Sequence, residues 1–267
     1  MVTVPVPDQV ALGKLPKRSD PRTLSLPKLL TGEITADPEI SNETAVTEPW
    51  GVLGNDSLGD CAIAAAAHAE MLWAAKHGRP RPDPTLKQVT DAYSKITGYQ
   101  EGDPDTDQGA DLLSVLKYWQ QKGIAGQNIG AFAEILPHDV QTLKWTIAKL
   151  DLAYVGLQLP AAWKTPAAKG QRAGFTPTRK PWNPATWQNP YRGHCVIYTG
   201  YRDDSFTCVS WGEVITVPMA FHKAFCDEAY AIIAPDRLDE RTETPGQLNT
   251  KALKETLARV QNWPSPD

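Results

Sequence analysis

One predicted helix constrains the fold of this chain more than any other stretch. Residues 61–77, CAIAAAAHAEMLWAAKH, consist mostly of helix formers, and their apolar side chains surround the helix on nearly all sides. A helix without a polar face must be covered on every side by other elements. The turn-rich sequence 54–60 precedes it, with Asp60 as the N-cap, and Gly78 follows its end. We therefore expect this helix to be the central helix of a lobe.

Length and composition indicate a globular protein with a sizeable core. The chain has 267 residues, 41% of them hydrophobic, and a net charge of −4 with both signs spread along it. This pattern argues against a nucleic-acid or membrane-surface partner. The first 20 residues lack an apolar run of signal-peptide length, and no segment has the roughly 20 apolar residues of a membrane span. We expect a cytoplasmic protein.

The four cysteines predict neither a disulfide framework nor a zinc site. They are few for the length of the chain and none has the CxxC spacing of zinc ligands; they are Cys61, Cys195, Cys208 and Cys226. Reduced thiols are the expectation, with no metal and no cofactor.

Three segments are predicted along the chain. Residues 1–48, rich in proline, threonine and charge, form an extended N-terminal arm that wraps the body. Residues 49–237 form one domain. Residues 238–267 form a polar tail with one short amphipathic helix at 250–261.

The domain divides into a helical half and a half made mostly of strands. Apolar residues at helical spacing predict helices at 61–77, 85–97, 110–122 and 137–150. Runs of β-formers predict strands at 152–159, 195–201, 205–211, 213–219 and 230–235. Helices followed by strands indicate an α+β fold, with a helical lobe at about 49–136 and a β lobe at about 137–237.

Cys61 is a candidate nucleophile because it falls in the first turn of the predicted central helix. The positive end of the helix dipole and its unpaired N–H groups favour a thiolate there. A lone cysteine in an apolar helix is more often a small buried hydrophobe. A catalytic role for Cys61 therefore needs a partner elsewhere in the chain.

Histidine is the partner that thiol chemistry needs, because it takes up the thiol proton and later protonates a leaving group. His68 lies on the same helix as Cys61, roughly 10 Å away at two turns, beyond hydrogen-bonding distance. His194 begins a predicted strand, from which its side chain can face a cleft. We predict His194 as the partner and a structural role for the rest, which are His68, His77, His138 and His222.

Several motifs resemble those of the papain-like cysteine peptidases. His194-Cys195-Val196 followed by Gly200-Tyr201 resembles the family's histidine strand, HxVxxxGY, and Ser210-Trp211-Gly212 resembles its NSWG. His194 lies 133 residues after Cys61, within the range of about 130–150 typical of the family. Asn55 and Gly59 occupy the offsets of the family's upstream glutamine and glycine. The segment 109–124 takes the place of its Gly-rich turn and helix, so the resemblance covers about residues 48–235.

The resemblance implies a papain-like two-lobed fold: a helical lobe, an antiparallel β-barrel-like lobe and a cleft between them. It implies that Cys61 attacks a carbonyl and that His194 protonates the leaving amine. The Cys61 N–H and the Asn55 amide would hold the oxyanion. Trp211 would shield His194 from solvent. The residues expected to contact the substrate are Gly59, Asp60, Gly109 and Trp211.

Two departures from the family pattern bear on activity. Asn55 is one methylene, about 1.3 to 1.5 Å, shorter than the family's glutamine. Val209 falls at the position of the family's orienting asparagine and cannot form a side-chain hydrogen bond. Ser210, one residue on, could substitute for that asparagine, or Cys61 and His194 could act as a dyad without a third group.

Two further stretches have alternative interpretations. Residues 103–109, DPDTDQG, resemble a calcium loop, but glycine stands at the seventh position and Ser114 at the twelfth, so a solvated acidic loop is favoured. Residues 163–192 carry six Lys or Arg, three Trp and no acidic residue. Such a mixture can bind nucleic acid. Because the segment leads directly to His194, a lid or wall of a peptide cleft is favoured over nucleic-acid binding, and an inert loop stays an equally open alternative.

The sequence favours a papain-like thiol hydrolase acting on peptide or isopeptide bonds of a polypeptide substrate. Two alternatives stay open. One is a catalytically inactive papain-like module used to bind or assemble with a protein partner, as Val209 and the short Asn55 would suggest. The other is an amidase or a transglutaminase-type acyl transferase. The arm is too short to resemble the family's inhibitory propeptide, so no zymogen cleavage is predicted; the oligomeric state cannot be read from the sequence.

Overall fold

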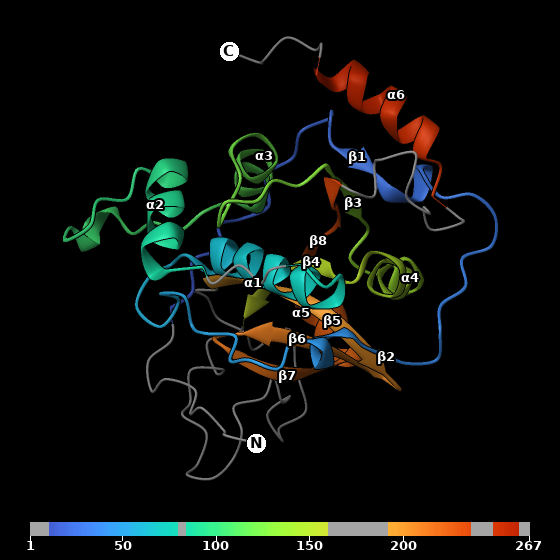
Figure 1. Ribbon diagram of the computed structural model, residues 1–267, viewed down its shortest axis with the longest axis horizontal. Coiled ribbons are helices and arrows are strands. Elements are labelled where there is room, and N and C mark those ends of the chain that lie inside the picture. Colours follow the sequence, from blue (N-terminus) through green and yellow to red (C-terminus); the bar gives the residue numbers. More distant parts are fainter. Residues whose placement is uncertain (1–10, 80–83, 160–191, 236–247, 262–267) are drawn as a thin grey trace.

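The computed structural model describes residues 11–79, 84–159, 192–235 and 248–261. Its centre is an eight-stranded sheet in the order β1-β3-β8-β4-β5-β6-β7, with β2 paired to β5 (Figure 1). All pairings are antiparallel except that of β1 with β3. The strands are β1 (Leu24–Ser25), β2 (Ile40–Ser41), β3 (Ala131–Ile135), β4 (Ala153–Leu159), β5 (Arg192–Arg202), β6 (Ser205–Ser210), β7 (Glu213–Pro218) and β8 (Cys226–Ile233).

Six α-helices and three short 3-10 helices accompany the sheet in the described residues. The α-helices are α1 (Cys61–Lys76), α2 (Leu86–Thr97), α3 (Leu112–Lys122), α4 (Val140–Leu150), α5 (Met219–Phe225) and α6 (Thr250–Gln261). The 3-10 helices are η1 (Leu26–Lys28), η2 (Asn42–Ala45) and η3 (Pro104–Thr106). The α+β class is confirmed, and the predicted helices and strands are all present. Besides the three 3-10 helices, four short elements were not predicted: β1, β2, β3 and α5.

The strand β3 lies within the range 49–136 that the sequence pattern marks as helical. It pairs along its length with β8, so strands of the sheet begin before residue 137. Within the described residues the sheet runs from β1 at one edge to β7 at the other.

The helix α1 is buried along nearly its whole length, as its composition requires. One hydrophobic cluster packs α1 against α2, α3 and one face of the sheet, and Tyr154 of β4 donates a hydrogen bond of 2.6 Å to the Ala62 carbonyl. Figure 1 shows α1 in the middle of the molecule, between the sheet and these helices. The expected central helix is confirmed, and its N-terminal end lies against β5.

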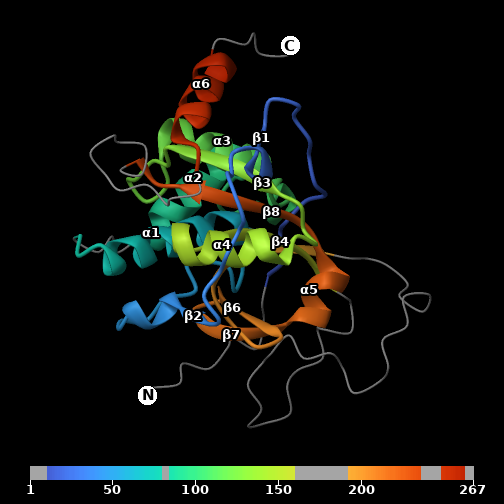
Figure 2. The same ribbon diagram turned by 90° about the vertical axis from the view of Figure 1, so that its right-hand side faces the viewer.

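The opposite face of the sheet packs against α4, seen lengthwise in Figure 2, and α5. Side chains alternate between the two cores along each strand: Tyr154 of β4 faces α1, whereas Val155 belongs to the α4 core. The N-terminal arm joins this second core through Leu24, Leu26 and Leu29. From β1 onward the arm is thus anchored, since β1 pairs with β3 and β2 with β5.

Candidate active site

Cys61 is the first residue of α1, and its side chain is buried. Asp60 stands at the N-cap position, but its side chain forms no capping hydrogen bond. The Asp60 carboxyl is instead packed beneath the preceding loop: a Cβ on Gly54 would lie 2.9 Å from Asp60 Oδ2. Burial raises the pKa of Asp60 well above its usual range. The side chain of Asp60 therefore packs against this loop and is not exposed in a substrate cleft.

The Cys61 thiol is neutral in this structure. Burial raises its pKa to about 11, and this outweighs the backbone hydrogen bonds from Cys195 and Gly13 and the Lys14 charge, which lower it. The helix dipole and N–H groups were expected to favour a thiolate. That expectation is wrong for this state, because the free-energy cost of removing a thiolate from water exceeds the stabilisation that the helix N-terminus provides.

His194 lies on β5 in a fully enclosed setting. Its Nε2 is 2.7 Å from Ser210 Oγ, and its ring stacks on Trp211 with centroids 4.2 Å apart and planes 12° apart. Trp211 thus covers one face of the ring, as expected. Burial lowers the pKa of His194 to about 3, so the ring is neutral. Its Nδ1 is buried and has no hydrogen-bond partner in the described part of the chain.

The alternation of β6 decides between Val209 and Ser210. The Val209 side chain lies in the core formed with α1, where it is packed among apolar groups. Because neighbouring residues on a strand point to opposite faces, Ser210 points the other way, toward His194. The serine that the sequence left open as a substitute for the family's asparagine is therefore hydrogen-bonded to His194.

The strand β5 also places His194 at the same end of the domain as Cys61. Cys195, the next residue after His194, hydrogen-bonds through its backbone to the Cys61 sulfur. The side chain of Cys195 belongs to the same hydrophobic cluster as Cys61. This backbone contact links Cys61 to the neighbour of His194, but no hydrogen bond joins the Cys61 sulfur to His194 Nδ1 in the described residues.

Asn55 is buried in the loop before α1. Its amide Nδ2 donates to the Leu58 carbonyl at 3.0 Å and to the Ala11 carbonyl at 3.3 Å. The first contact holds the loop itself. The second reaches a carbonyl of the N-terminal arm, so the amide can donate to an oxygen of a chain lying against this loop.

Residues 11–15 of the arm lie across the candidate site, which the sequence did not show. The Lys14 N–H donates to the Gly193 carbonyl at 2.9 Å. On the other side, the Ala110 N–H donates to the Gly13 carbonyl at 2.8 Å and the Leu15 N–H donates to the Ala110 carbonyl at 3.0 Å. The arm therefore pairs with backbone on both sides, like a short strand.

Glycines leave the room that this crossing segment needs. A Cβ on Gly109, whose φ is +81°, would lie 2.0 Å from the Gly13 carbonyl oxygen. A Cβ on Gly193 would lie 2.4 Å from the Lys14 carbonyl oxygen, and one on Gly59 would lie 3.2 Å from the Gly13 Cα. Gly59 and Gly109, both predicted to contact substrate, thus lie against the arm.

The acidic stretch 103–109 is partly structural rather than a solvated loop. The Asp107 carboxylate accepts hydrogen bonds from the Gly59 N–H, at 3.1 Å, and from the Tyr93 hydroxyl. The Tyr93 hydroxyl in turn accepts from the Gly109 N–H at 2.9 Å. This link joins the loop before α1 to the turn before α3, and sequence reasoning missed it.

The remaining histidines that form described contacts are structural. His68 Nε2 lies 2.9 Å from the Gly51 carbonyl oxygen, and His77 Nε2 lies 2.9 Å from Asp151 Oδ2. In the described residues, no group of three or more His, Cys, Asp or Glu is arranged to hold a metal ion. No helix there has the length and apolarity to cross a membrane. Almost all of the basic and aromatic segment 163–192 lies outside the described residues.

Comparison with known proteins identifies the fold. No model of a known protein family and no curated protein matches the chain. Among solved structures, xylellain, a cysteine protease from Xylella fastidiosa, matches with a TM-score of 0.61 and 17% identity, over 87% of this chain and 99% of that one. Digestive procathepsin L2 from Tenebrio molitor matches with a TM-score of 0.57 and 11% identity, over 86% and 80%. The chain has the papain-like fold.

The proform of Amb a 11, a ragweed pollen cysteine protease, matches over 96% of this chain and 69% of that one, with a TM-score of 0.55 and 14% identity. Such low identities make this chain a divergent example of the papain-like fold. Sequence reasoning missed three residues at its candidate site, Lys14, Asp107 and Glu228. Glu228 had a visible signal: two carboxylates, at 227 and 228, stand directly before the apolar run AYAII of β8.

Proposed function

We propose that this chain is a papain-like thiol hydrolase that cleaves peptide or isopeptide bonds of polypeptides, with Cys61 as nucleophile and His194 as its base and acid. The setting of His194 carries the proposal. One ring nitrogen is engaged by Ser210 and one ring face by Trp211, while the other nitrogen, Nδ1, has no partner in the described residues. Leaving a buried polar atom unpaired is costly, and a catalytic role is one explanation for such an atom. The cysteine proteases that share the fold support the same chemistry.

The proposed reaction is acyl transfer in two steps. His194 Nδ1 takes the Cys61 thiol proton, and the sulfur attacks the substrate carbonyl carbon. When the tetrahedral intermediate collapses, the C–N bond breaks, and the imidazolium gives its proton to the leaving amine. In the second step His194 takes a proton from water, whose oxygen attacks the thioester. The C–S bond then breaks, a carboxylic acid leaves and the proton returns to Cys61.

Asn55 and the Cys61 N–H are the proposed donors to the oxyanion. The Cys61 N–H stands at the start of α1, where backbone N–H groups have no partner within the helix. The Asn55 amide already donates to a carbonyl oxygen of the arm at 3.3 Å, which is long for such a bond. We propose that a substrate carbonyl takes over this donor when the arm leaves.

We propose that the arm-covered form is an inactive resting form. The pKa of about 11 for Cys61 and of about 3 for His194 both arise mainly from burial. With these values the thiol holds its proton far more strongly than the imidazole does. We propose that departure of residues 11–15 readmits water and brings the two values closer, so that proton transfer becomes feasible.

Selective alkylation tests the proposal. In a chain whose arm is loosened by Lys14→Ala, an active site predicts that Cys61 reacts with iodoacetamide at pH 6 faster than the other three buried cysteines, and that His194→Ala removes that advantage. Cys208→Ala is the matched control, because Cys208 is also a buried free thiol but lies in the α4 core. Peptide hydrolysis should disappear in Cys61→Ala and persist in Cys208→Ala. Equal reactivity of all four thiols, with no hydrolysis, would contradict the proposal.

One observation favours the second candidate, an inactive module that binds a protein partner. The arm covers Cys61 with a set of backbone hydrogen bonds, and the thiol is neutral there. This alternative predicts that no peptide acylates Cys61 even after the arm is loosened. An acyl transferase would instead give mostly amide product with an added amine. The cytoplasmic location stays a prediction from the sequence.

A further inference from the structure

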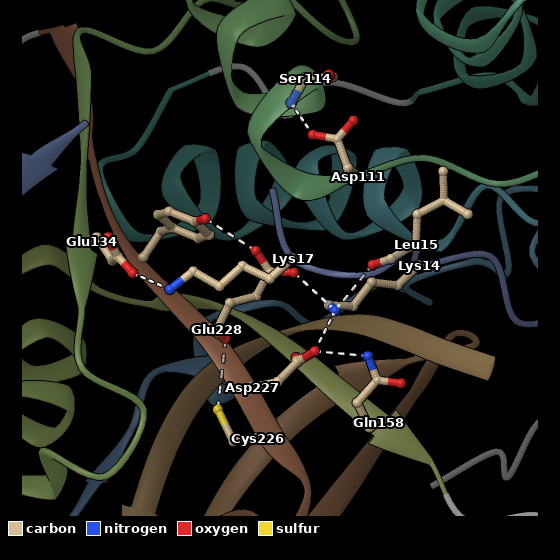
Figure 3. A network of polar contacts seen from close by, with 11 residues as sticks. Lys14, Leu15, Lys17, Asp111, Ser114, Glu134, Gln158, Cys226, Asp227 and Glu228 are labelled. Atoms are coloured by element: carbon tan, nitrogen blue, oxygen red, sulfur yellow. Dashed lines mark hydrogen bonds and ion pairs between the residues drawn. The ribbon is translucent and has the colours of Figure 1, made fainter. Parts of the chain in front are cut away.

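Lys14 is a fully buried lysine with a charged pocket around its ammonium group. Its Nζ lies 2.8 Å from Asp227 Oδ2 and 2.8 Å from Glu228 Oε1, and none of its side chain is exposed (Figure 3). Both carboxylates come from the start of β8. Burial by itself lowers the pKa of Lys14, but the charges of Glu228 and Asp227 outweigh it and raise the pKa above its usual value. The lysine is therefore buried in its charged form.

The pocket is held in shape by groups other than Lys14. Gln158 donates to Asp227 Oδ2 at 2.7 Å, and the Tyr230 hydroxyl donates to Glu228 Oε2 at 3.0 Å. Figure 3 shows Gln158 reaching Asp227 from the neighbouring strand β4. Each carboxylate thus has its own support within the sheet. Lys14 is therefore one of several groups that hold the two carboxylates in place.

Gly156 of β4 leaves space for the Lys14 side chain in this pocket. A Cβ at this position would lie 2.3 Å from Lys14 Cε and 2.6 Å from Glu228 Cγ, so any other residue would fill the space that the lysine stem occupies. The backbone of Gly156 is not in the left-handed region. Glycine is present there for room and not for conformation.

The backbone of the arm is held in a way that needs no particular side chain. Lys14 forms isolated bridges with Ala110 on one side and Gly193 on the other. Main-chain pairing of this kind gives affinity to any extended peptide, and pockets for single side chains give specificity. Gly13, the residue before Lys14, hydrogen-bonds through its backbone to the Cys61 sulfur, so the arm connects this pocket to the proposed nucleophile.

We infer that the acidic pocket formed by Asp227 and Glu228, which holds Lys14 in this structure, is a substrate subsite that selects polypeptides with a lysine at the position Lys14 occupies. This inference rests on the proposed hydrolase function. The arm is then an internal occupant of the subsite, and a substrate takes its place. Glu228 is the specificity-determining residue, because its carboxylate is buried at the inner end of the pocket while that of Asp227 is partly exposed.

Kinetics of the full chain carrying Lys14→Ala test the inference, since this variant leaves the acidic groups and removes their occupant. Peptides that differ only by lysine, methionine or glutamate at one position are compared. We expect kcat/KM to favour lysine over methionine by roughly 30-fold or more, the lower end of what removing one partner of a buried charge pair costs. Adding Glu228→Gln should remove most of this preference.

Lys17→Ala is the matched control for Lys14→Ala. Lys17 belongs to the same arm and pairs with Glu134, but both side chains are about one third exposed. This variant should neither raise the cleavage rate nor change the preference. Cleavage without any preference for lysine, or a preference that Glu228→Gln leaves intact, would overturn the inference while the hydrolase proposal stands.

A binding measurement separates the two proposals. Fluorescence polarisation of labelled lysine and methionine peptides on Cys61→Ala/Lys14→Ala needs no catalysis. Tighter binding of the lysine peptide that depends on Glu228, with no cleavage by the parent Lys14→Ala chain, would support the subsite and overturn the hydrolase. Equal binding, or no binding of either peptide, would show that the pocket only anchors the arm, and the inference would fail.

Discussion

Two buried histidines of this molecule differ in a way that separates support from chemistry. His222 of α5 has both ring nitrogens engaged: Nε2 lies 2.7 Å from the Pro137 carbonyl oxygen and Nδ1 lies 3.2 Å from the Tyr198 hydroxyl. His194 of β5 is buried equally well, but only its Nε2 has a partner among the described residues. Burial therefore does not distinguish the two. The unused nitrogen does.

The two histidines also differ in what covers them. His222 lies on the α4 side of the sheet and packs against the rings of Tyr198 and Phe206. His194 lies next to Cys195, whose backbone contacts Cys61, and the Cys61 sulfur is in turn covered by Gly13 of the arm. The first cover is part of the core. The second is a strand-like segment held by isolated bridges and not by a continuous strand pairing.

The largest expected effect comes from exchanging each histidine for alanine. His194→Ala should lower kcat/KM by about 10²–10⁴, the usual contribution of a general base and acid. His222→Ala should instead lower the free energy of unfolding by about 2–4 kcal/mol, because it leaves a cavity and two unpaired groups. Activity per folded molecule should be unchanged in His222→Ala. Similar losses of activity in both would break the comparison.

Loosening the cover should have the next largest effect. Lys14→Met removes the partner of two carboxylates, and the loss of a buried partner costs about 3–5 kcal/mol, so alkylation of Cys61 should accelerate by roughly 100-fold. Lys17→Met breaks only a partly exposed pair and should accelerate it less than about fivefold. Rates by mass spectrometry under one reagent concentration decide this. An unchanged rate in Lys14→Met would mean that the arm does not limit access.

The contact with Ser210 should matter less than His194 itself. A hydrogen bond to a charged group contributes about 1.5–3 kcal/mol, so Ser210→Ala should lower kcat/KM by about 10- to 100-fold. KM should stay nearly constant, because Ser210 touches His194 and not the arm. Ser210→Thr keeps the hydroxyl and should retain most of the rate. A loss in Ser210→Thr as large as in Ser210→Ala would point to packing as the cause.

The smallest effect concerns stability at acid pH. Burial lowers the pKa of His222 to about 4 and that of His194 to about 3, from an ordinary value of 6.5. The unfolded chain then binds more protons between these values, so stability is complete above pH 6.5 and falls as the pH decreases toward 4. His222→Gln should make the decrease of the unfolding free energy with falling pH less steep, because one titrating group is removed. Urea unfolding from pH 7 to 4 measures it, and an unaltered slope would show that His222 does not titrate in the unfolding transition.

Much of the helical half and of the His194 strand could be predicted because the signals are local. An alanine-rich helix after a turn and two alternating strands are read from neighbouring residues, and α1, β5 and β6 lie where expected. The structural neighbours confirm the papain-like fold. The contact of Ser210 with His194 was one of two alternatives from the sequence. The direction of the side chains on β6 selects it.

The crossing of the arm could not be predicted in the same way. Lys14 contacts Asp227 across 213 positions of sequence, and its backbone partners are Gly193 of β5 and Ala110 in the turn before α3. Each of these contacts arises only once the sheet has formed. The neutral state of Cys61 depends on the same burial, so a local rule about helix termini gave the wrong protonation state.

The distance along the chain from Lys14 to its first anchor has a consequence for how substrates compete. Only residues 15–23 separate Lys14 from β1, which is fixed to β3. Short flexible linkers hold a ligand at an effective concentration on the order of millimolar. An incoming polypeptide therefore competes with a tethered segment whose effective concentration does not depend on the concentration of the protein. Scarce or weakly held peptides would be excluded, and abundant or multivalent ones admitted.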